Sequence, residues 1–315
     1  MKAEDIAIVH QDHHLLVLNK PAGVVIHPTY KNAHGDTLWD ALLTYLSQQE
    51  AEEWQPPELP DEPTWAAAPL HIQTMLRDRR RERLWKEDGP LLRPCLLHRL
   101  DKDTSGVVAL AKTERSRRYI IKQFHDHTIR KRYLAVVQKG APLWAVPRTT
   151  FTVTRHAQDG RPTLVGAEFD FFALGDDMIE LNGPLQRDPD ERRRCIVGSE
   201  GDEAITQCSV LAAEHRFLLL EVRPITGRTH QIRAHLAALG YAIVGDSMYG
   251  SHGENGIVAP ARQFLHAYSL QLRQYPDDKL CTFVAPLAND LTSWLQQHFP
   301  SGLGVLNAKT TVPDQ

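Results

Sequence analysis

The sequence has few cysteines and no long apolar segment. Only four of its 315 residues are cysteines and none forms a C-x-x-C pair, so their spacing indicates neither a zinc site nor a disulfide framework. Scattered thiols of this kind are typical of buried side chains in a reducing compartment. No stretch is long and apolar enough to cross a membrane, and the charged start does not resemble a secretion signal. We therefore expect a soluble, cytoplasmic protein without a membrane partner.

Positive charge is not in excess either. The chain has 36 lysines and arginines against 39 aspartates and glutamates, which gives a formal net charge of -3 and a pI of about 6.6. An overall basic charge is the usual sign of a nucleic-acid-binding domain, so any RNA binding has to come from local clusters of arginine and lysine. A glycine-rich phosphate loop and internal repeats are also absent, and the length alone allows about two domains.

Short segments with the composition of strands are distributed along the whole chain. We predict strands at 6–10, 14–19, 107–111, 132–138, 163–172, 204–212, 216–223, 264–273 and 280–284. We predict helices from Asp36 onward and at 70–85, 114–127, 229–239 and 287–299, with a poorly ordered tail after Pro300. Because strands and helices do not alternate regularly, the pattern favours an α+β fold over a doubly wound one.

Three segments differ from the rest in charge. Residues 50–63 alternate acidic residues with prolines, which predicts a mobile acidic linker. The helix predicted after this linker carries a cluster of arginines: Arg77, Arg79, Arg80, Arg81 and Arg83. Such a basic helix is either a solvated face or a phosphate-binding surface, and the sequence favours neither interpretation. A second arginine-rich segment, 187–194, is predicted to be an exposed loop.

The segment 96–113, LLHRLDKDTSGVVALAKT, places a polar turn between two apolar stretches. Acidic, basic and hydroxyl side chains are thereby held together between packed segments, and loops on rigid scaffolds commonly carry function. Gly106 allows the backbone to bend sharply there. The simpler interpretation is an ordinary turn with a surface ion pair between Arg99 and Asp101.

Four motifs in this chain resemble those of the RluA-type pseudouridine synthases, which isomerise uridines in structured RNA. They are NKPAG at 19–23, HRLDKDTSG at 98–106, KRYLA at 131–135 and PITGRTHQIR at 224–233, and they occur in the family's order. The resemblance implies one α+β domain over residues 1–300, with a mixed, largely antiparallel central sheet flanked by helices. Two departures are an insert at about 48–94 and the expected lack of an N-terminal S4-type RNA-binding domain. A tail at 301–315 is expected to be disordered.

The resemblance also assigns roles to residues. Asp101 matches the catalytic aspartate, which acts either by attacking C1′ or by removing a proton from C2′ of the ribose. Arg233 matches the arginine that pairs with this aspartate and offsets the cost of desolvating it. Tyr133 matches the residue that stacks on the target uracil, and its hydroxyl is available to assist proton removal at C5. The reaction requires neither a metal nor another cofactor.

Further residues are expected to support the substrate. Arg99 resembles the side chain that fills the gap left by a flipped uridine, and a phosphate contact is the simpler alternative. Lys20, Arg228 and His230 are expected to position either phosphates or the catalytic loop itself. Taken without the resemblance, Tyr133 is a core residue of a strand and Arg233 a solvent-facing residue of a helix.

Two other functions are compatible with parts of the sequence. A catalytically silent RNA-binding or RNA-folding factor would keep the scaffold, but binding alone does not require a carboxylate facing an RNA backbone. A metal hydrolase would use histidines, yet the pairs His125 and His127 or His230 and His235 do not bring three or four ligands together. We therefore predict an RNA pseudouridine synthase whose partner is ribosomal or transfer RNA, with no obligatory protein partner evident.

Overall fold

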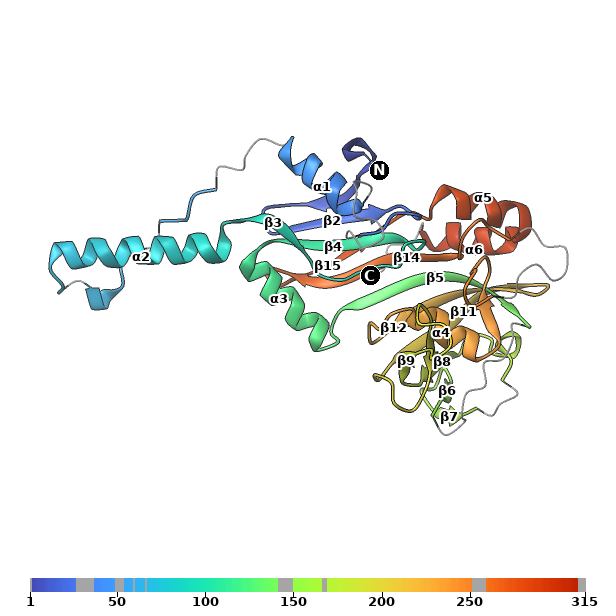
Figure 1. Ribbon diagram of the computed structural model, residues 1–315. Coiled ribbons are helices and arrows are strands. Elements are labelled where there is room, and N and C mark those ends of the chain that lie inside the picture. The colour runs from blue at the N-terminus through green and yellow to red at the C-terminus, as the bar shows by residue number, and fades with distance from the viewer. Residues whose placement is uncertain are drawn as a thin grey trace.

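A single mixed sheet, built from strands along the whole chain, dominates the fold (Figure 1). The computed structural model describes residues 2–26, 37–48, 54–58, 60–65, 67–140, 150–165, 169–250 and 259–310. Of these, Lys309 and Thr310 are described by their backbone only. Within these residues thirteen strands follow the order β1-β2-β4-β14-β5-β12-β11-β8-β6-β7, with β13 beside β5, β15 beside β14 and β3 beside β4. Every pairing is antiparallel except that of β14 with β4. The predicted α+β fold is confirmed.

The elements have the following bounds in the described residues. The strands of the sheet are β1 Ala7–Gln11, β2 Leu15–Lys20, β3 Pro90–Leu96, β4 Ser105–Thr113, β5 Arg130–Lys139, β6 Thr152–His156, β7 Pro162–Leu164, β8 Met178–Asn182, β11 Ile205–Glu214, β12 Phe217–Pro224, β13 Tyr241–Ile243, β14 Leu265–Gln274 and β15 Lys279–Val284. A separate hairpin consists of β9 Leu185–Arg187 and β10 Cys195–Val197. The helices are α1 Leu38–Ser47, α2 Leu70–Asp88, α3 Glu114–His125, α4 Gln231–Ala238, α5 Asn289–His298 and α6 Pro300–Thr310, with short 3₁₀ turns at Ala3–Asp5, Pro63–Trp65 and Phe171–Ala173. None of these helices is long and apolar enough to span a membrane.

Strand β2 is buried on both faces of the sheet. Along β2, Leu15 and Val17 belong to the cluster beneath α3, whereas Leu16 and Leu18 belong to the cluster beneath α1. Successive strand residues point to opposite faces, so a continuous apolar run is what a doubly covered strand requires. Asp36, the predicted cap of α1, lies outside the described residues, and Thr37 caps this helix by accepting from the Asp40 amide.

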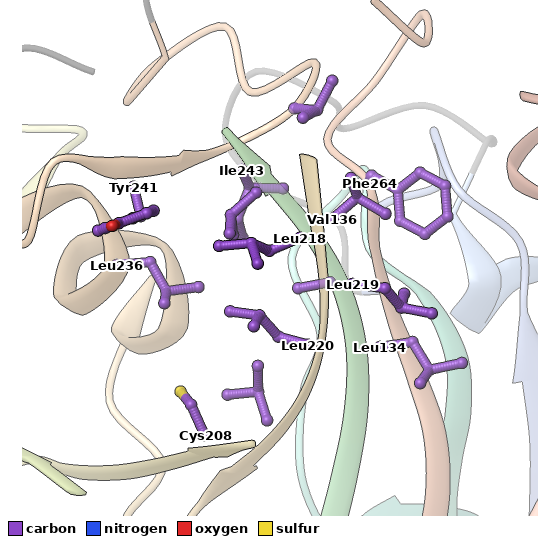
Figure 2. Packing of buried hydrophobic residues seen from close by; sticks show 14 of the residues in the cluster. Leu134, Val136, Cys208, Leu218, Leu219, Leu220, Leu236, Tyr241, Ile243 and Phe264 are labelled. Carbon is purple, nitrogen blue, oxygen red and sulfur yellow. The ribbon is translucent and has the colours of Figure 1, made fainter. Parts of the chain in front are cut away.

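The second half of the sheet packs against α4. Figure 2 shows Leu218 and Leu220 of β12 on the side of Leu236 in α4, and Leu219 on the opposite side with Phe264. Seven of the eight residues of α4 are buried, so it is a core helix rather than a surface one. Gly240 follows it with φ +77°, as predicted for a helix-ending glycine. This packing holds α4 rigidly over the central strands.

The prediction of a strand at 163–172 is wrong for most of its described residues. Among these, only the part within β7, Pro162–Leu164, forms a strand, and Phe171–Ala173 forms a 3₁₀ turn capped by the carboxylate of Asp170. The Tyr241 hydroxyl also donates to Asp170 (2.7 Å), and Phe171 is fully buried. A side chain anchored in this way bends the backbone into the core instead of continuing a ladder. Strands β6 and β8, which the sequence pattern did not reveal, take that place in the sheet.

The prediction of disorder after Pro300 is also wrong for residues 301–310, which continue from α5 as α6. Phe299 and Leu306 are buried in the main core, and the Ser301 hydroxyl donates to Glu214 of β11 (2.5 Å). An apolar side of the helix therefore finds a partner that the local composition did not indicate. The remaining residues, 311–315, lie outside the described part of the chain.

Helix α2 extends away from the sheet (Figure 1). It confirms the helix predicted at 70–85, and none of its side chains is buried. Strand β3 follows directly and pairs with β4, so the protruding part of the predicted insert ends before Pro90. The described part of the acidic segment does not run free as a linker, because it folds back on α2, where Asp61 pairs with Arg77.

Candidate active site

Asp101 lies in the loop between β3 and β4, and Lys20 supports this loop from within. The fully buried ammonium of Lys20 donates to the backbone carbonyls of Pro21 (2.8 Å), Val24 (2.9 Å) and Lys102 (2.9 Å). Burial lowers the pKa of Lys20 to about 7. Since Lys20 has no exposed surface, the geometry favours the second of its two predicted roles, support of the loop over contact with phosphate.

The carboxyl-terminal end of the loop is held by β14 and by Arg262, which lies just before that strand. Gly106 has φ +116°, and a Cβ atom there would lie 2.2 Å from the Ala267 carbonyl oxygen, so only glycine allows this close approach. The Arg262 guanidinium donates to the Asp103 carbonyl (3.0 Å) and to the Ser105 hydroxyl (3.1 Å). The loop is therefore held by backbone contacts at both ends, which leaves the Asp101 side chain free to face a partner.

Arg233 of α4 connects Asp101 to a second carboxylate, that of Asp246. Its Nη1 donates to Asp101 Oδ2 (2.9 Å), while Nε and Nη2 donate to the two oxygens of Asp246 (2.7 and 2.9 Å). The side chains of Arg233 and Asp246 are 7% and 0% exposed. Burial acts to lower the pKa of Arg233, but the two carboxylates raise it above its ordinary value. The predicted contact between Asp101 and Arg233 is present, and Arg233 is not a solvent-facing residue.

A cavity of about 340 Å³ lies beside Asp101 and is bordered by Tyr133 of β5. This volume is at the lower end of the range for small-ligand sites. Burial and the charge of Asp101 raise the pKa of Tyr133, so its hydroxyl stays protonated at neutral pH. Lys131, on the same strand, donates to the Thr226 carbonyl (2.7 Å), and burial lowers its pKa to about 8. This bond ties the segment 224–233 to the wall of the cavity.

His230 lies between Asp101 and Tyr249. Its Nδ1 is 3.2 Å from the Tyr249 hydroxyl and its Nε2 is 3.8 Å from Asp101 Oδ2. The Tyr249 hydroxyl already donates to the Cys195 carbonyl (2.8 Å), so His230 Nδ1 has to be the donor to it. Burial lowers the pKa of His230, although the nearby Asp101 carboxylate acts to raise it.

The two remaining predicted residues, Arg99 and Arg228, differ in their freedom. Arg99 is exposed and borders both the cavity at Tyr133 and a second one of about 410 Å³ on the other side of Asp101. Arg228 is partly committed to the protein, since its Nε donates to the Glu203 carbonyl (3.0 Å). Arg99 is therefore better placed than Arg228 to enter an RNA helix or reach a phosphate.

Sequence reasoning missed Asp246 and Tyr249, which both hold Arg233. Asp246 Oδ1 accepts from the backbone amides of Met248 (2.9 Å) and Tyr249 (3.1 Å), and the ring of Tyr249 lies 5.0 Å from the Arg233 guanidinium. The only local signal is an aspartate directly after Gly245, which is typical of a turn. Nothing in the sequence indicates that this turn meets α4, because that contact is made through the fold.

A metal site is not formed by the histidines considered in the sequence. In the described ranges no group of three or more histidine, cysteine, aspartate or glutamate side chains is suited to hold a metal ion. His235 is used in the core instead, where it bonds Thr206 Oγ1 (2.9 Å) and the Gly183 carbonyl (2.9 Å).

Comparison with known proteins places this site in a family. Residues 14–238 match the model of the family described as RNA pseudouridylate synthase. An uncharacterised RNA pseudouridine synthase of Chloroflexus aurantiacus is 33% identical, over 89% of this chain and 65% of its own length. The ribosomal large subunit pseudouridine synthases D of Xylella fastidiosa and Zymomonas mobilis are 30% and 29% identical, each over 91% of this chain and over 68% and 70% of their own lengths.

Solved structures support the fold. Human RNA pseudouridylate synthase domain containing 1 aligns with a TM-score of 0.53 at 21% identity, over 100% of this chain and 98% of its own. Human RNA pseudouridylate synthase domain containing 4 aligns with a TM-score of 0.52 at 21% identity, over 92% of each chain. The family model matches the chain from β2 to β12 and helix α4. This range includes every one of the motifs that form the cavity. This chain belongs to the RNA pseudouridylate synthase family, whose members isomerise uridines in RNA.

Proposed function

We propose that Asp101 performs the chemistry on the ribose of the target uridine, with Arg233 as its fixed counter-charge and Tyr133 as the platform for the uracil. The observation that supports this assignment is the arrangement of the three side chains around one cavity. Arg233 occupies one oxygen of Asp101, and no donor from the described part of the chain bonds the other, Oδ1. A carboxylate held in this way is oriented by Arg233 and keeps one oxygen available to the substrate.

The reaction breaks the N1–C1′ bond, rotates the uracil and joins C5 to C1′, after which the proton on C5 has to leave. Asp101 acts either as a nucleophile at C1′, forming a sugar ester, or as a base at C2′. Both routes require an ionised carboxylate that does not move during the rotation. Since Arg233 is itself clamped by Asp246, the position of Asp101 is set by the core rather than by a flexible surface pair.

Tyr133 is suited to stacking and not to acting as a charged base. Its pKa is raised by burial, so a phenolate is not available at neutral pH. A neutral phenol can accept the C5 proton only by passing on its own, which makes the ring contact its main contribution. Tyr133→Phe is therefore expected to stay active at a reduced rate, whereas Tyr133→Ala loses turnover by at least about tenfold, as measured in single-turnover assays. Equal, full activity of both variants would contradict the stacking role.

Large-subunit ribosomal RNA is the substrate class that we propose. The names of several relatives, those of Zymomonas and Xylella among them, refer to the large ribosomal subunit. Exposed Arg99 beside the cavity is placed to fill the gap left when a uridine leaves its helix, a step that costs a few kcal/mol of stacking. Mapping pseudouridines in total RNA from a deletion strain identifies the site, and loss of a transfer-RNA pseudouridine alone would refute the ribosomal assignment. A cytoplasmic location stays a prediction.

The decisive test compares the two carboxylates of the loop. Asp101→Asn keeps the shape of the side chain and removes its charge, so turnover is expected to fall by at least about 10³-fold while RNA binding is retained. Asp103→Asn is the matched control, because its recorded contact with Arg262 is made by the backbone. Pseudouridine formation by Asp101→Asn at the parental rate would reject the assignment. The purified parent protein is also tested on the RNA that lacks a pseudouridine in the deletion strain. Failure to form pseudouridine on that RNA would favour a catalytically silent RNA-binding factor.

A further inference from the structure

Helix α2 has no part in the catalytic arrangement described above. None of its residues borders either cavity at Asp101. It is attached to the body at its carboxyl end, where Arg115 of α3 pairs with Glu87 and with Asp88 (3.0 Å), and where Trp85 lies against Trp54 with ring centres 5.5 Å apart. Beyond this base the helix extends into solvent (Figure 1). A helix that is polar on all sides gains no stability from packing one face on a core, so packing on the fold does not account for α2.

The arginines of α2 fall on two faces. At 100° per residue, Arg77, Arg80 and Arg81 share one side of the helix, while Arg79, Arg83 and Lys86 share the opposite side. We call the first set the covered face and the second the open face. On the open face, the contact that the structure records is the weak pair of Arg83 with Glu87, one helical turn away (3.2 Å).

The described residues 54–58 and 60–65 of the acidic region, together called segment 54–65, lie on the covered face. Asp61 receives two hydrogen bonds from the guanidinium of Arg77, with Nε at 2.8 Å. Arg80 donates to the Pro60 carbonyl (2.9 Å) and lies 5.6 Å from the centre of the Trp65 ring. The Arg81 side chain reaches Gln55 (3.3 Å), and a cavity of about 550 Å³ remains between the segment and the helix.

These contacts are specific in geometry but weak in energy. A planar guanidinium that grips two carboxylate oxygens uses the arrangement with which arginine grips a phosphate. The pair is solvated, since Arg77 and Asp61 are 47% and 40% exposed. Exposed pairs of this kind contribute little to stability, whereas a polyanion that neutralises arginines gains free energy by releasing its counterions. An RNA backbone therefore has the means to displace Asp61.

We propose that the covered face binds backbone phosphates of the RNA substrate away from the active site, and that segment 54–65 occupies this face until RNA replaces it. The proposal rests on the proposed function only in taking RNA as the substrate. At about 3.3 Å per strand residue and 1.5 Å per helical residue, β3 and the last turns of α2 place Arg81 up to roughly 35 Å from the Asp101 loop. The sequence left open whether this helix touches RNA, and in the structure α2 extends away from the sheet and borders neither cavity at Asp101.

Replacing Asp61 and replacing Arg77, the two partners of one ion pair, are expected to change RNA affinity in opposite directions. Asp61→Asn uncovers Arg77 and is expected to tighten RNA binding up to about fivefold, the limit set by an exposed pair. Asp78→Asn removes the same charge from a position of α2 with no recorded ion pair and is the matched control. Dissociation constants are measured with the full-length protein and a base-paired RNA of about 24 pairs, long enough at about 3 Å per pair to reach from Asp101 to α2.

A second set of variants tests the covered face itself. The triple change Arg77→Gln, Arg80→Gln and Arg81→Gln is expected to weaken binding by about tenfold and to lower the salt slope by about 2, because three phosphate contacts are lost. The equivalent change of the open face, Arg79→Gln, Arg83→Gln and Lys86→Gln, is expected to have a clearly smaller effect. An RNA hairpin of about 8 pairs, too short to reach α2 at about 3 Å per pair, is expected to bind all variants alike.

Two results would overturn the proposal. The first is an equal gain in affinity from Asp61→Asn and Asp78→Asn, since net charge alone then explains it. The second is an equal loss from the covered-face and open-face triples, or none from either, which leaves α2 as a solvated protrusion. The control variants of α2, Asp78→Asn and the open-face triple, are expected to keep the parental turnover, which Asp101→Asn loses, so failure of this inference is distinct from failure of the proposed function.

Discussion

The protein uses the same ion pair, an aspartate gripped by an arginine, in two surroundings. Arg233 and Asp246 are 7% and 0% exposed beside the active site, whereas Arg77 and Asp61 are 47% and 40% exposed on α2. In both pairs the guanidinium donates to both carboxylate oxygens. The chemistry of the side chains is therefore constant, and only the surrounding medium differs.

This difference decides what each pair is able to do. In the interior, removal of one partner leaves an uncompensated charge away from water, so the pair is held in place. At the surface, water and salt replace the partner at little cost. The buried pair is suited to fixing the position of Asp101, and the exposed pair is suited to exchanging its carboxylate for a phosphate.

Replacing Asp246 is expected to have the largest effect. Asp246→Asn leaves Arg233 buried with Asp101 as its remaining carboxylate partner, and we expect a loss of about 3–5 kcal/mol in the free energy of unfolding. If the variant folds, a misplaced Arg233 lowers kcat by about 10²-fold with little change in KM. Asp290→Asn, which affects the partly exposed partner of Arg262, is the control and is expected to cost less. Parental kcat in Asp246→Asn would show that the position of Arg233 does not matter for the reaction.

The contrast between buried and exposed side chains also applies to histidines, and the pH dependence of stability tests it. Burial lowers the pKa of His235 and of His266 to about 4, and both are fully buried. Below about pH 6.5 the unfolded chain binds protons at these histidines while the folded protein does not, so the free energy of unfolding falls as pH decreases from 6.5 toward 4. At pH 5 the loss is about 2 kcal/mol for each histidine.

Urea unfolding at pH 7 and pH 5 measures this loss. His235→Gln removes one of the two groups and is expected to be less stable at pH 7 but to lose less stability on acidification than the parent. His125, whose side chain is 87% exposed, serves as the control position, and His125→Gln is expected to change neither value. Identical acid dependence of the parent and His235→Gln would contradict the assignment of a buried, neutral His235.

The smallest effect is expected at the exposed pair. Asp61→Asn should change the free energy of unfolding by less than about 1 kcal/mol, because water replaces the lost contact. The measurement is the urea midpoint at low and high salt, with Asp78→Asn beside it. A loss of stability as large as that of Asp246→Asn would show that segment 54–65 is a structural part of the fold and not a displaceable cover.

Local elements of the fold were largely readable from the sequence. The strands β2 and β4, the helices α2 and α3, and the loop around Asp101 follow from apolar runs, periodicity and turn residues that act over a few neighbours. The exceptions were segments whose conformation depends on distant partners. Asp170 bends the predicted strand at 163–172 because Tyr241 bonds it, and α6 forms after Pro300 because β11 and the core receive it.

For the site, the sequence by itself determined which chemical groups are present and, through four motifs, that Asp101, Tyr133 and Arg233 belong together. The tertiary structure alone decided that Arg233 is clamped by Asp246, that Lys20 is buried under the loop, and that α2 extends away from the sheet and borders neither cavity at Asp101. The physical reason is that an ionic contact depends on distance and on exclusion of water. Residues far apart in the chain create both, and the sequence pattern around any one charged residue contains neither.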